Sequence, residues 1–388
     1  MDELTYALIT PYSLYKSRTG GIIGRLIANA ELELVGCRMY IFSDEFVDAY
    51  RDLICSTVDD PTIRDAWSQY IDNNLRRGRQ AGAAPRCMLM LFRGENAVRH
   101  LKEDVIGPVT EQIAGDTIRG TFGDYITEGG KVKYFEPAVI TCPHNDVIDR
   151  HLKLFARYAL SDGGMLEGTL QYDEDPECSL VMLKPDNFYK RSRRPGNIID
   201  TFSNTGLRIV GTKLFSMTVA QGEEFYGPLK DIFVEKLQFL VTKPAYERLK
   251  DAYEFPFNEG DAEVLGRHLA ERNAISEFNK IIEYMTGVHP DTIAPSEKPT
   301  ASRARCLAML YEGPDAIEKI RRVLGSTDPS KAEPGTVRSD FGRDLMRNGA
   351  HASDSPQNAI RERRIVGLLE PDKDTCDVIE IVNEFLEE

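Results

Sequence analysis

The chain contains the same order of short motifs twice, and this internal repeat limits the possible folds more than any other feature. The repeated motifs are apolar runs of strand length, which pair as Leu4–Pro11 with Cys178–Pro185, Leu34–Met39 with Ile209–Leu214, and Arg86–Gly94 with Arg305–Gly313. Gly94 and Gly313 are separated by 219 residues, and so are Arg119 and Arg338. One shared offset over that distance indicates two copies of one domain. We predict domains at 1–160 and 173–388, joined by the acidic stretch Ser161–Pro176.

Each copy has the order strand, helix, strand, variable helical segment, strand, helix, and then a loop that leads to a C-terminal helix. Both copies begin the first helix near a glycine and place apolar residues at helical spacing after it, at Ile23 and Leu26 and at Ile199 and Phe202. This order predicts the βαββαβ pattern of the ferredoxin-like fold, an α+β architecture with an antiparallel sheet. The variable segment of the second copy is long, and we predict a helical insertion at about 216–302.

Composition limits the class of protein. With 41% hydrophobic and 28% charged residues the 388-residue chain is typical of a globular protein, and no run approaches the roughly 20 apolar residues of a membrane span. The first residues contain neither a basic nor an apolar signal region, so we expect a cytoplasmic location. A net charge of −14 argues against a nucleic-acid surface. The seven cysteines are scattered without a CxxC pair, which favours reduced, buried thiols over zinc ligation.

The segment around His351 is the candidate site. Ser353, Asp354 and Ser355 follow the histidine as a cluster of helix N-cap residues, and Glu362 lies two turns along the predicted helix. We therefore expect His351 on an irregular loop that the start of a helix holds in place. No Gly-x-x-x-x-Gly-Lys-[Ser/Thr] motif occurs, so any phosphate group would have to be bound by side-chain cations and hydroxyls.

Several separated motifs of the second copy resemble those of nucleoside diphosphate kinases. The resembling segments, in chain order, are Leu183-Lys184-Pro185-Asp186, Gly325-Ser326-Thr327-Asp328-Pro329, Gly335-Thr336-Val337-Arg338-x-Asp340-Phe341 and Asn348-x-x-His351-Ala352-Ser353-Asp354. The resemblance implies two such domains in tandem, the first degenerate and the second catalytic.

The resemblance also implies a reaction. His351 would take the γ-phosphate from a nucleoside triphosphate such as ATP and pass it to a nucleoside diphosphate, the two half-reactions of ping-pong catalysis. Glu362 falls where the family has a carboxylate that orients the imidazole, with Ser353 and Asp354 in support. Lys184 falls among the catalytic and phosphate-binding positions.

The remaining implied nucleotide and phosphate ligands are Arg321, Thr327, Arg338 and Asn348. Mg²⁺ would bridge the phosphates rather than occupy a protein cage. Because the family assembles as oligomers, a two-domain chain is expected to form a dimer or trimer.

Two parts of the chain depart from the family pattern. The insertion contains no clear match to the residues that hold the base. Phe278, Arg272 and Tyr226 are candidates, and packing within the helices is the alternative role of Phe278 and Tyr284. In the first copy Thr10 replaces the lysine, and the offset places Lys102 opposite Arg321 and Val132 opposite His351. His144 is the nearest histidine, without the asparagine and serine of the motif. We predict a catalytically inactive first copy.

Two other functions remain open. One is a nucleotide-binding or regulatory protein without catalysis, and the other is a module that passes phosphate from His351 to another protein. The amphipathic tail Asp377–Leu386 is expected to pack on its own domain rather than on a membrane, because its other face is acidic.

Overall fold

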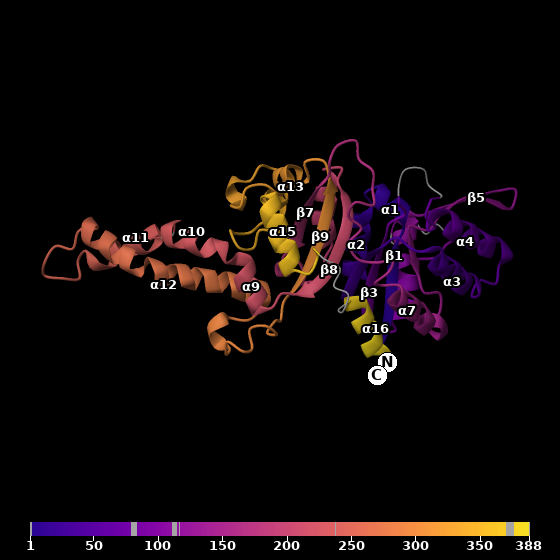
Figure 1. Cartoon of the computed structure of the whole chain (residues 1–388), viewed down its shortest axis with the longest axis horizontal. Helices are drawn as coiled ribbons and strands as arrows, with labels where there is room; N and C mark the ends of the chain where they lie inside the picture. Colours follow the sequence, from indigo (N-terminus) through magenta and orange to yellow (C-terminus); the bar gives the residue numbers. More distant parts are fainter. Residues whose placement is uncertain are drawn as a thin grey trace. The chain divides into compact units, whose positions relative to one another are not determined.

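The structure is a computed structural model that describes residues 2–78, 84–110, 115, 117–236, 238–369 and 376–387. These residues form two units, one of residues 1–215 and 307–388 and the other of residues 216–306. The first unit contains two four-stranded sheets and one two-stranded sheet, and Figure 1 shows the second unit as a bundle of helices. No described helix is both long and apolar enough to cross a membrane.

The first half of the chain forms a four-stranded antiparallel sheet in the order β2-β3-β1-β6. Its elements are β1 (Asp2–Ile9), α1 (Pro11–Tyr15), α2 (Thr19–Asn29), β2 (Glu33–Tyr40), α3 (Asp44–Cys55), α4 (Pro61–Asn74), β3 (Cys87–Glu95), α5 (Ala97–His100), the π-helix η1 (Leu101–Ile106), α6 (Ile118–Phe122), the hairpin β4 (Asp124–Glu128) and β5 (Lys131–Glu136), β6 (Val139–Thr141), η2 (Asn145–Val147) and α7 (Ile148–Arg157).

The second half forms a sheet of the same order, β10-β7-β9-β8. Its elements are β7 (Glu177–Leu183), η3 (Pro185–Asn187), α8 (Arg194–Ser203), β8 (Arg208–Ser216), β9 (Arg305–Gly313), α13 (Ala316–Leu324), η5 (Pro329–Lys331), α14 (Val337–Phe341), β10 (Ala350–Ala352), α15 (Pro356–Ile365) and the tail helix α16 (Asp377–Glu387). The α+β class and the predicted long strands are thereby confirmed. The division into tandem domains at 160 and 173 stays a prediction.

The unit of residues 216–306 is helical. It contains α9 (Val219–Tyr226), α10 (Pro228–Lys236), α11 (Gln238–Leu249), α12 (Glu259–Thr286) and η4 (Pro290–Thr292). The long α12 begins with a capping box, in which Asn258 and Asp261 each bond the other's backbone N–H. It ends at Gly287, whose φ of 74° is typical of a helix C-terminus.

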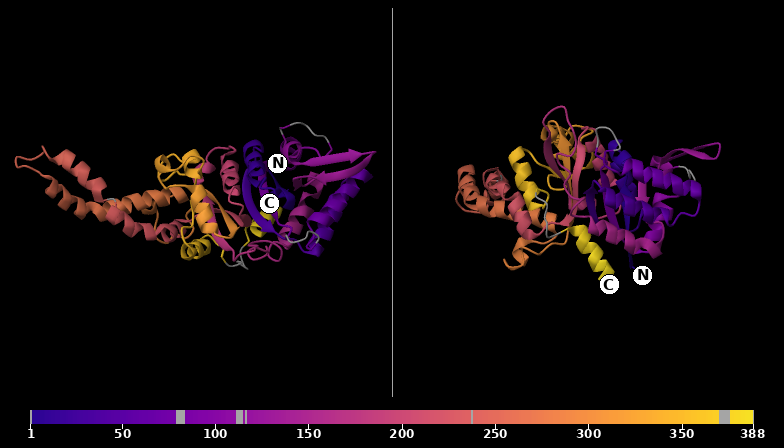
Figure 2. Two further views of the ribbon diagram at one scale, coloured as in Figure 1. Left: turned by 90° about the horizontal axis from the view of Figure 1, so that it is seen from above. Right: turned by 45° about the vertical axis from the view of Figure 1, so that its right-hand side comes forward.

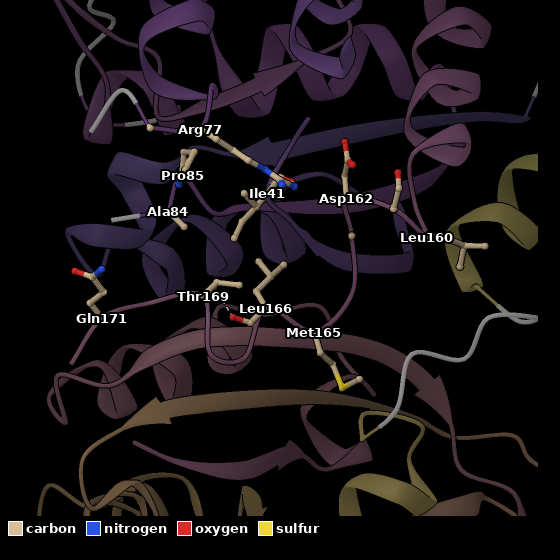
Figure 3. Close-up of a pocket in the computed structure, with 13 residues that line it drawn as sticks. Ile41, Arg77, Ala84, Pro85, Leu160, Asp162, Met165, Leu166, Thr169 and Gln171 are labelled. Carbon is tan, nitrogen blue, oxygen red and sulfur yellow. Dashed lines mark hydrogen bonds between the residues drawn. The ribbon is translucent and has the colours of Figure 1, made fainter. Parts of the chain in front are cut away.

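The segment that connects the halves lies against the second strand of both sheets. Ile41 N donates to Asp162 O and Leu166 N donates to Val210 O. A cavity of about 620 Å³ lies beside this segment (Figure 3). Its Arg77 donates to the carbonyls of Ile41 and Phe42, and its Asp162 accepts from Ser43. The charged groups of Arg77 and Asp162 therefore hold neighbouring loops in place. Because both are bonded to protein groups, the cavity does not resemble a phosphate site.

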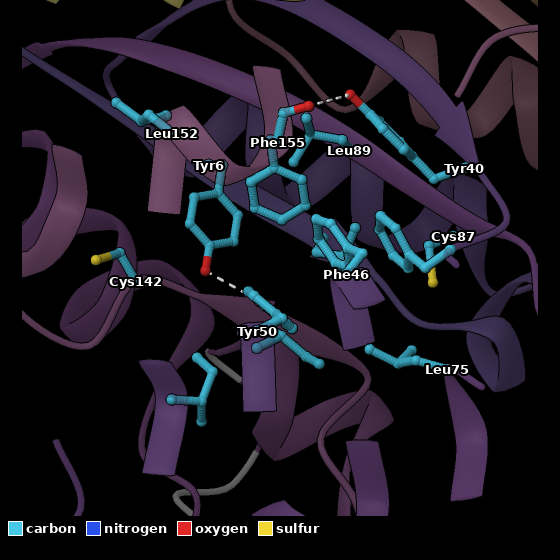
Figure 4. Packing of buried hydrophobic residues seen from close by; sticks show 14 of the residues in the cluster. Tyr6, Tyr40, Phe46, Tyr50, Leu75, Cys87, Leu89, Cys142, Leu152 and Phe155 are labelled. Carbon is cyan, nitrogen blue, oxygen red and sulfur yellow. Dashed lines mark hydrogen bonds between the residues drawn. The ribbon is translucent and has the colours of Figure 1, made fainter. Parts of the chain in front are cut away.

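The core of the first half is rich in aromatic side chains. Phe155 lies within 4.8 to 6.1 Å, centroid to centroid, of Tyr6, Tyr50, Phe46 and other rings. The hydroxyls of Tyr6 and Tyr50 lie 2.9 Å apart (Figure 4), which gives both buried polar atoms a partner.

The tail helix packs on the first half, so our prediction that it packs on its own domain was wrong. Val378 and Val382 of α16 belong to the core cluster of the first half, and α16 contacts β2 and α7. Figures 1 and 2 show α16 in yellow beside the indigo strands of that sheet. The amphipathic pattern predicted an apolar surface beneath the helix, but a helical period carries no information on which surface that is.

The packing of α16 predicts that a change in the tail destabilises the first half. We expect Val382→Ala to lower the free energy of unfolding by about 2 kcal/mol, because it opens a cavity in a closed core. The single tryptophan of the chain is Trp67, in the core of the first half. Its fluorescence during urea unfolding therefore reports on that half. Glu384→Ala, at an exposed position of α16, is the control; an unchanged Trp67 transition in Val382→Ala would contradict the packing.

Candidate active site

His351 lies in the middle of β10, which pairs with β7 so that His351 is opposite Met182. The expectation of an irregular loop was wrong. A strand of three residues is too short for a two-residue period to be visible in the sequence, and only the pairing with β7 defines it. The His351 side chain is 20% exposed. It can therefore be reached from solvent while its partners lie beneath it.

A buried carboxylate orients the imidazole. His351 Nε2 lies 2.9 Å from Glu362 Oε2, and Ser353 Oγ donates to the same oxygen at 2.7 Å. Burial raises the pKa of Glu362, but the charge of His351 and the hydrogen bonds from His351 and Ser353 outweigh it and hold that pKa below its ordinary value. Because an ionised Glu362 only accepts, the proton of a neutral His351 ring is on Nε2, and in that form the lone pair of the ring is on Nδ1.

Lys184 follows β7 directly, and its backbone N–H donates to Gly349 O, just before β10. Its Nζ donates to Asn348 Oδ1 at 2.7 Å and to Met346 O at 3.0 Å. The amide of Asn348 donates in turn to Thr327 O at 3.1 Å. Three predicted residues from three distant segments thus share one chain of hydrogen bonds.

The two arginines lie on α13 and α14, and both donate hydrogen bonds to backbone near His351. Arg338 Nη1 donates to Gly325 O at 3.0 Å and to Thr327 Oγ1 at 3.4 Å, and Nη2 donates to Ala350 O at 3.5 Å. Arg321 is exposed at the end of α13, and its Nη1 donates to Asp354 O at 3.0 Å. Both guanidinium groups are therefore fixed next to the strand that carries His351.

Gly325 is required where the two arginine-bearing segments meet. Its φ is 84°, and a Cβ added there would lie 2.5 Å from Thr336 Oγ1. Thr336 caps α14 by accepting from Ser339 N. The glycine allows the end of α13 to lie close to this cap. This close approach brings the segment of Arg321 next to the segment of Arg338.

The structure thus gathers every predicted site residue into one cluster: Lys184, Arg321, Thr327, Arg338, Asn348, His351, Ser353, Asp354 and Glu362. The sequence model of the nucleoside diphosphate kinase family matches residues 177–247 and 259–367. The nucleoside diphosphate kinase of Symbiobacterium thermophilum is 30% identical over 196 residues, which cover 50% of this chain and 90% of that protein. The chain belongs to the nucleoside diphosphate kinase family.

A second relative agrees with this membership. The nucleoside diphosphate kinase of Methanobrevibacter smithii is 30% identical over 210 residues, which cover 54% of this chain and 97% of that protein. Among solved structures, that of the Aquifex aeolicus nucleoside diphosphate kinase covers 50% of this chain and 95% of its own at 25% identity and a TM-score of 0.31. The family match lies in the second half of the chain.

The carboxylates around His351 are already bonded to other side chains. In the part of the chain that the structure describes, no group of three or more His, Cys, Asp or Glu side chains could hold a metal ion. Glu362 is used by His351 and Ser353, and Asp354 accepts from Asn358 Nδ2 at 2.7 Å. This donor set suits a metal ion that arrives on its own ligand, as Mg²⁺ does on phosphate groups, better than one held in a protein cage.

In the first half, the position of His351 is occupied by Ile140. Ile140 lies in the middle of β6 opposite Leu8, as His351 lies in β10 opposite Met182. The prediction that Val132 occupies this position was wrong. The β4–β5 hairpin, which turns at two glycines with positive φ, is longer than the loop of the second half and shifts the offset. His144 follows β6 instead of lying in it.

The surroundings of Arg119 are closed by aromatic side chains. Arg119 donates to Gly107 O and Val139 O, the same pattern as Arg338, but its guanidinium lies over the Trp67 ring, 5.7 Å from the ring centroid. Burial lowers the pKa of Arg119 to about 10. The cavity beside it measures about 10 Å³, which holds about one water molecule.

The first half has an acid near the position that Lys184 occupies in the second half. Thr10 follows β1 as Lys184 follows β7, and its Oγ1 donates to Glu136 at 3.0 Å. Tyr70 donates to the same carboxylate at 2.9 Å, and burial raises the pKa of Glu136. An acid thus lies where the second half has an amine.

Of the candidates for holding the base, Phe278 is buried within the helical unit, which agrees with its alternative role in packing. Tyr226 is buried as well, and Arg272 is exposed. Sequence reasoning missed Asn187 and Arg194, which bond to the site segments from behind. Only their position just after Lys184-Pro185-Asp186 could have drawn attention to them.

The hydrogen bond from Ser353 predicts a shift in the acid stability of the protein. A carboxylate with a depressed pKa stabilises the fold at high pH, and this stabilisation is lost as pH falls through the folded pKa. Ser353→Ala raises the pKa of Glu362, so the loss should begin at higher pH. At neutral pH we expect unfolding to cost about 2 kcal/mol less. Urea unfolding followed by circular dichroism between pH 3 and 7 measures both. Ser326→Ala, at an exposed position, is the control; parallel pH profiles would argue against the assignment.

Proposed function

We propose that the second half of the chain is a nucleoside diphosphate kinase that transfers the γ-phosphate of a nucleoside triphosphate through phospho-His351. The observation that carries this proposal is the contact of His351 Nε2 with the buried Glu362 at 2.9 Å, beside two arginines bonded to neighbouring backbone. A protein that only binds nucleotides needs the cations but not a nucleophile with an orienting carboxylate.

In the first half-reaction, Nδ1 of His351 attacks the γ-phosphorus. The N–P bond forms as the bond to the β–γ bridging oxygen breaks, and the nucleoside diphosphate leaves with that electron pair. Positive charge on the ring is offset by Glu362 through the Nε2 proton. A terminal oxygen of a second nucleoside diphosphate then attacks the phosphohistidine and restores neutral His351. Mg²⁺ carried by the nucleotide neutralises phosphate charge when bound.

The cations contribute by charge and direction. Phosphoryl transfer spreads charge over the equatorial oxygens, so fixed donors lower the barrier most when they need no rearrangement. The guanidinium groups of Arg321 and Arg338 are each tied to backbone carbonyls, which directs their other N–H groups. Thr327 adds a neutral hydroxyl, and Lys184 adds an amine held by Asn348.

The decisive test is labelling of His351. The protein is incubated with Mg²⁺ and γ-labelled ATP, assayed for acid-labile label, and then given GDP. We expect label on the protein that passes to GDP, none on His351→Ala, and full labelling of His144→Ala. Label that does not leave for GDP would favour transfer to another protein, and an unlabelled wild type would favour a binding protein.

We further propose that the first half binds no nucleotide, since Arg119 is covered by Trp67 and an acid replaces the amine. Calorimetric titration with Mg²⁺ and ADP should give one site per chain. Arg338→Ala should weaken that site at least tenfold, while Arg119→Ala, if folded, should leave its affinity unchanged. A stoichiometry of two would contradict this assignment.

Because family members assemble as oligomers, we also propose that the two-domain chains form a homo-oligomer, a dimer or a trimer. Measurement of the mass in solution tests this proposal.

A further inference from the structure

Behind the candidate site, one buried amide joins two of its segments. Asn187 is 1% exposed. Its Nδ2 donates to Lys184 O at 2.9 Å and to Gly349 O at 2.7 Å. Gly349 lies directly before β10, so the amide holds the Lys184 segment against the strand of His351.

Arg194 extends this connection to the third segment. Its Nε donates to Asn187 Oδ1 at 2.7 Å, and its Nη2 donates to Phe341 O at 2.6 Å and to Asp186 Oδ2 at 3.0 Å. Phe341 ends α14, the short helix that carries Arg338. The backbones beside the amine, the arginine and the nucleophile are therefore tied together by two side chains.

The first half contains a simpler form of the same ties. Ser13 Oγ donates to Ala138 O at 3.0 Å, and Arg18 Nη1 donates to Phe122 O at 2.6 Å. These bonds occupy the places of Asn187–Gly349 and Arg194–Phe341. The ties thus belong to the shared fold, and the second half adds to them the bonds to Lys184 O and between Asn187 and Arg194.

Arg194 is also the first residue of α8, and α8 packs on α2 of the first half. The contact is reciprocal, as in a two-fold dimer. Gly20 and Gly196 are equivalent in the repeat, and a Cβ on either would lie within 2.4 Å of the other's carbonyl oxygen. The same Cβ on Gly20 would meet Asp200, and that on Gly196 would meet Gly24, the equivalent of Asp200. Such pairing of equivalent residues defines an isologous interface.

A second pair of equivalent residues is in contact between the halves. Cys37 follows Val35-Gly36 as Thr212 follows Val210-Gly211. Cys37 Sγ lies 3.3 Å from Thr212 Oγ1. Both atoms are buried, so β2 and β8 are in contact there.

We propose that the first half acts as a built-in second subunit that sets the position of α8. Asn187 and Arg194 are then positioning residues: they connect α8 to the backbone segments that carry Lys184, Arg338 and His351. This inference rests on the proposed kinase function. Catalysis by positioning is sensitive to small displacements, and a shift of about 1 Å can cost 100-fold in rate. A half without a nucleophile thereby contributes to the reaction.

The positioning residues are tested by single-turnover labelling of His351. Arg194→Ala and Asn187→Ala should lower the labelling rate constant at saturating ATP by 10- to 100-fold, with less than threefold change in the half-saturating concentration. Arg194→Lys should restore part of the rate, because lysine keeps the charge but not the fork of donors. The double variant should lose less than the product of the single losses, since both act in one network. Arg191→Ala, exposed in the same segment, is the control.

The role of the first half is tested from within that half. At Gly20 a Cβ would lie 2.4 Å from Gly196 O, whereas at Gly24 the nearest atom is at 3.4 Å. Gly20→Ala should therefore slow labelling at least tenfold, and Gly24→Ala on the same helix should not. Trp67 fluorescence verifies that the first half remains folded.

The outcomes separate the two proposals. An unlabelled wild type would end the kinase proposal itself. A labelled wild type with folded Gly20→Ala and Arg194→Ala variants that react at the wild-type rate would overturn the positioning role alone. If Gly20→Ala does not fold, the Arg194 and Asn187 series decides.

Discussion

Three residue pairs between β10 and β7 hold the candidate site together. They place Ala350, His351 and Ala352 opposite Leu183, Met182 and Val181, and so bring the histidine beside a lysine far away in the sequence. A strand of three residues has few ladder bonds, and its position depends on what supports its ends. Asn187 supports the segment before it, and Ser353 and Glu362 support the segment after it. The orientation of the imidazole depends on all of these contacts.

The two halves show how one frame can carry opposite chemistry. Both have the same strand order, and both place an arginine that donates to the fourth strand and to the loop before the short helix. In the second half that arginine lies beside the Thr327 hydroxyl and donates to the strand that carries His351. In the first it is covered by an indole, and a protonatable acid replaces the amine. The cations of the second half would stabilise a bound anion. The acid and the indole of the first half would repel or exclude it.

The exchange of terminal segments fits the two-fold relation between the halves. The connecting segment bonds β8 of the second half through Leu166, and the tail helix covers β2 and α7 of the first. Each half thus receives a segment that follows the other half in sequence. The backbones of the halves also come into contact at Gly20 and Gly196. Each half alone would therefore be less stable than the whole chain, because separation would expose apolar surface on both halves.

The repeat, the order of strands and helices, and the residue types of the candidate site were all determined by the sequence itself, because an apolar period and a chemical motif are local properties of a chain. The tertiary structure alone decided which surface the tail covers, that His351 lies on a strand, and that Ile140 is its counterpart. It also brought Asn187 and Arg194 behind the site. These depend on strand register and on contacts between segments more than a hundred residues apart, and loops of unequal length in the two copies erase any offset from which they could be counted.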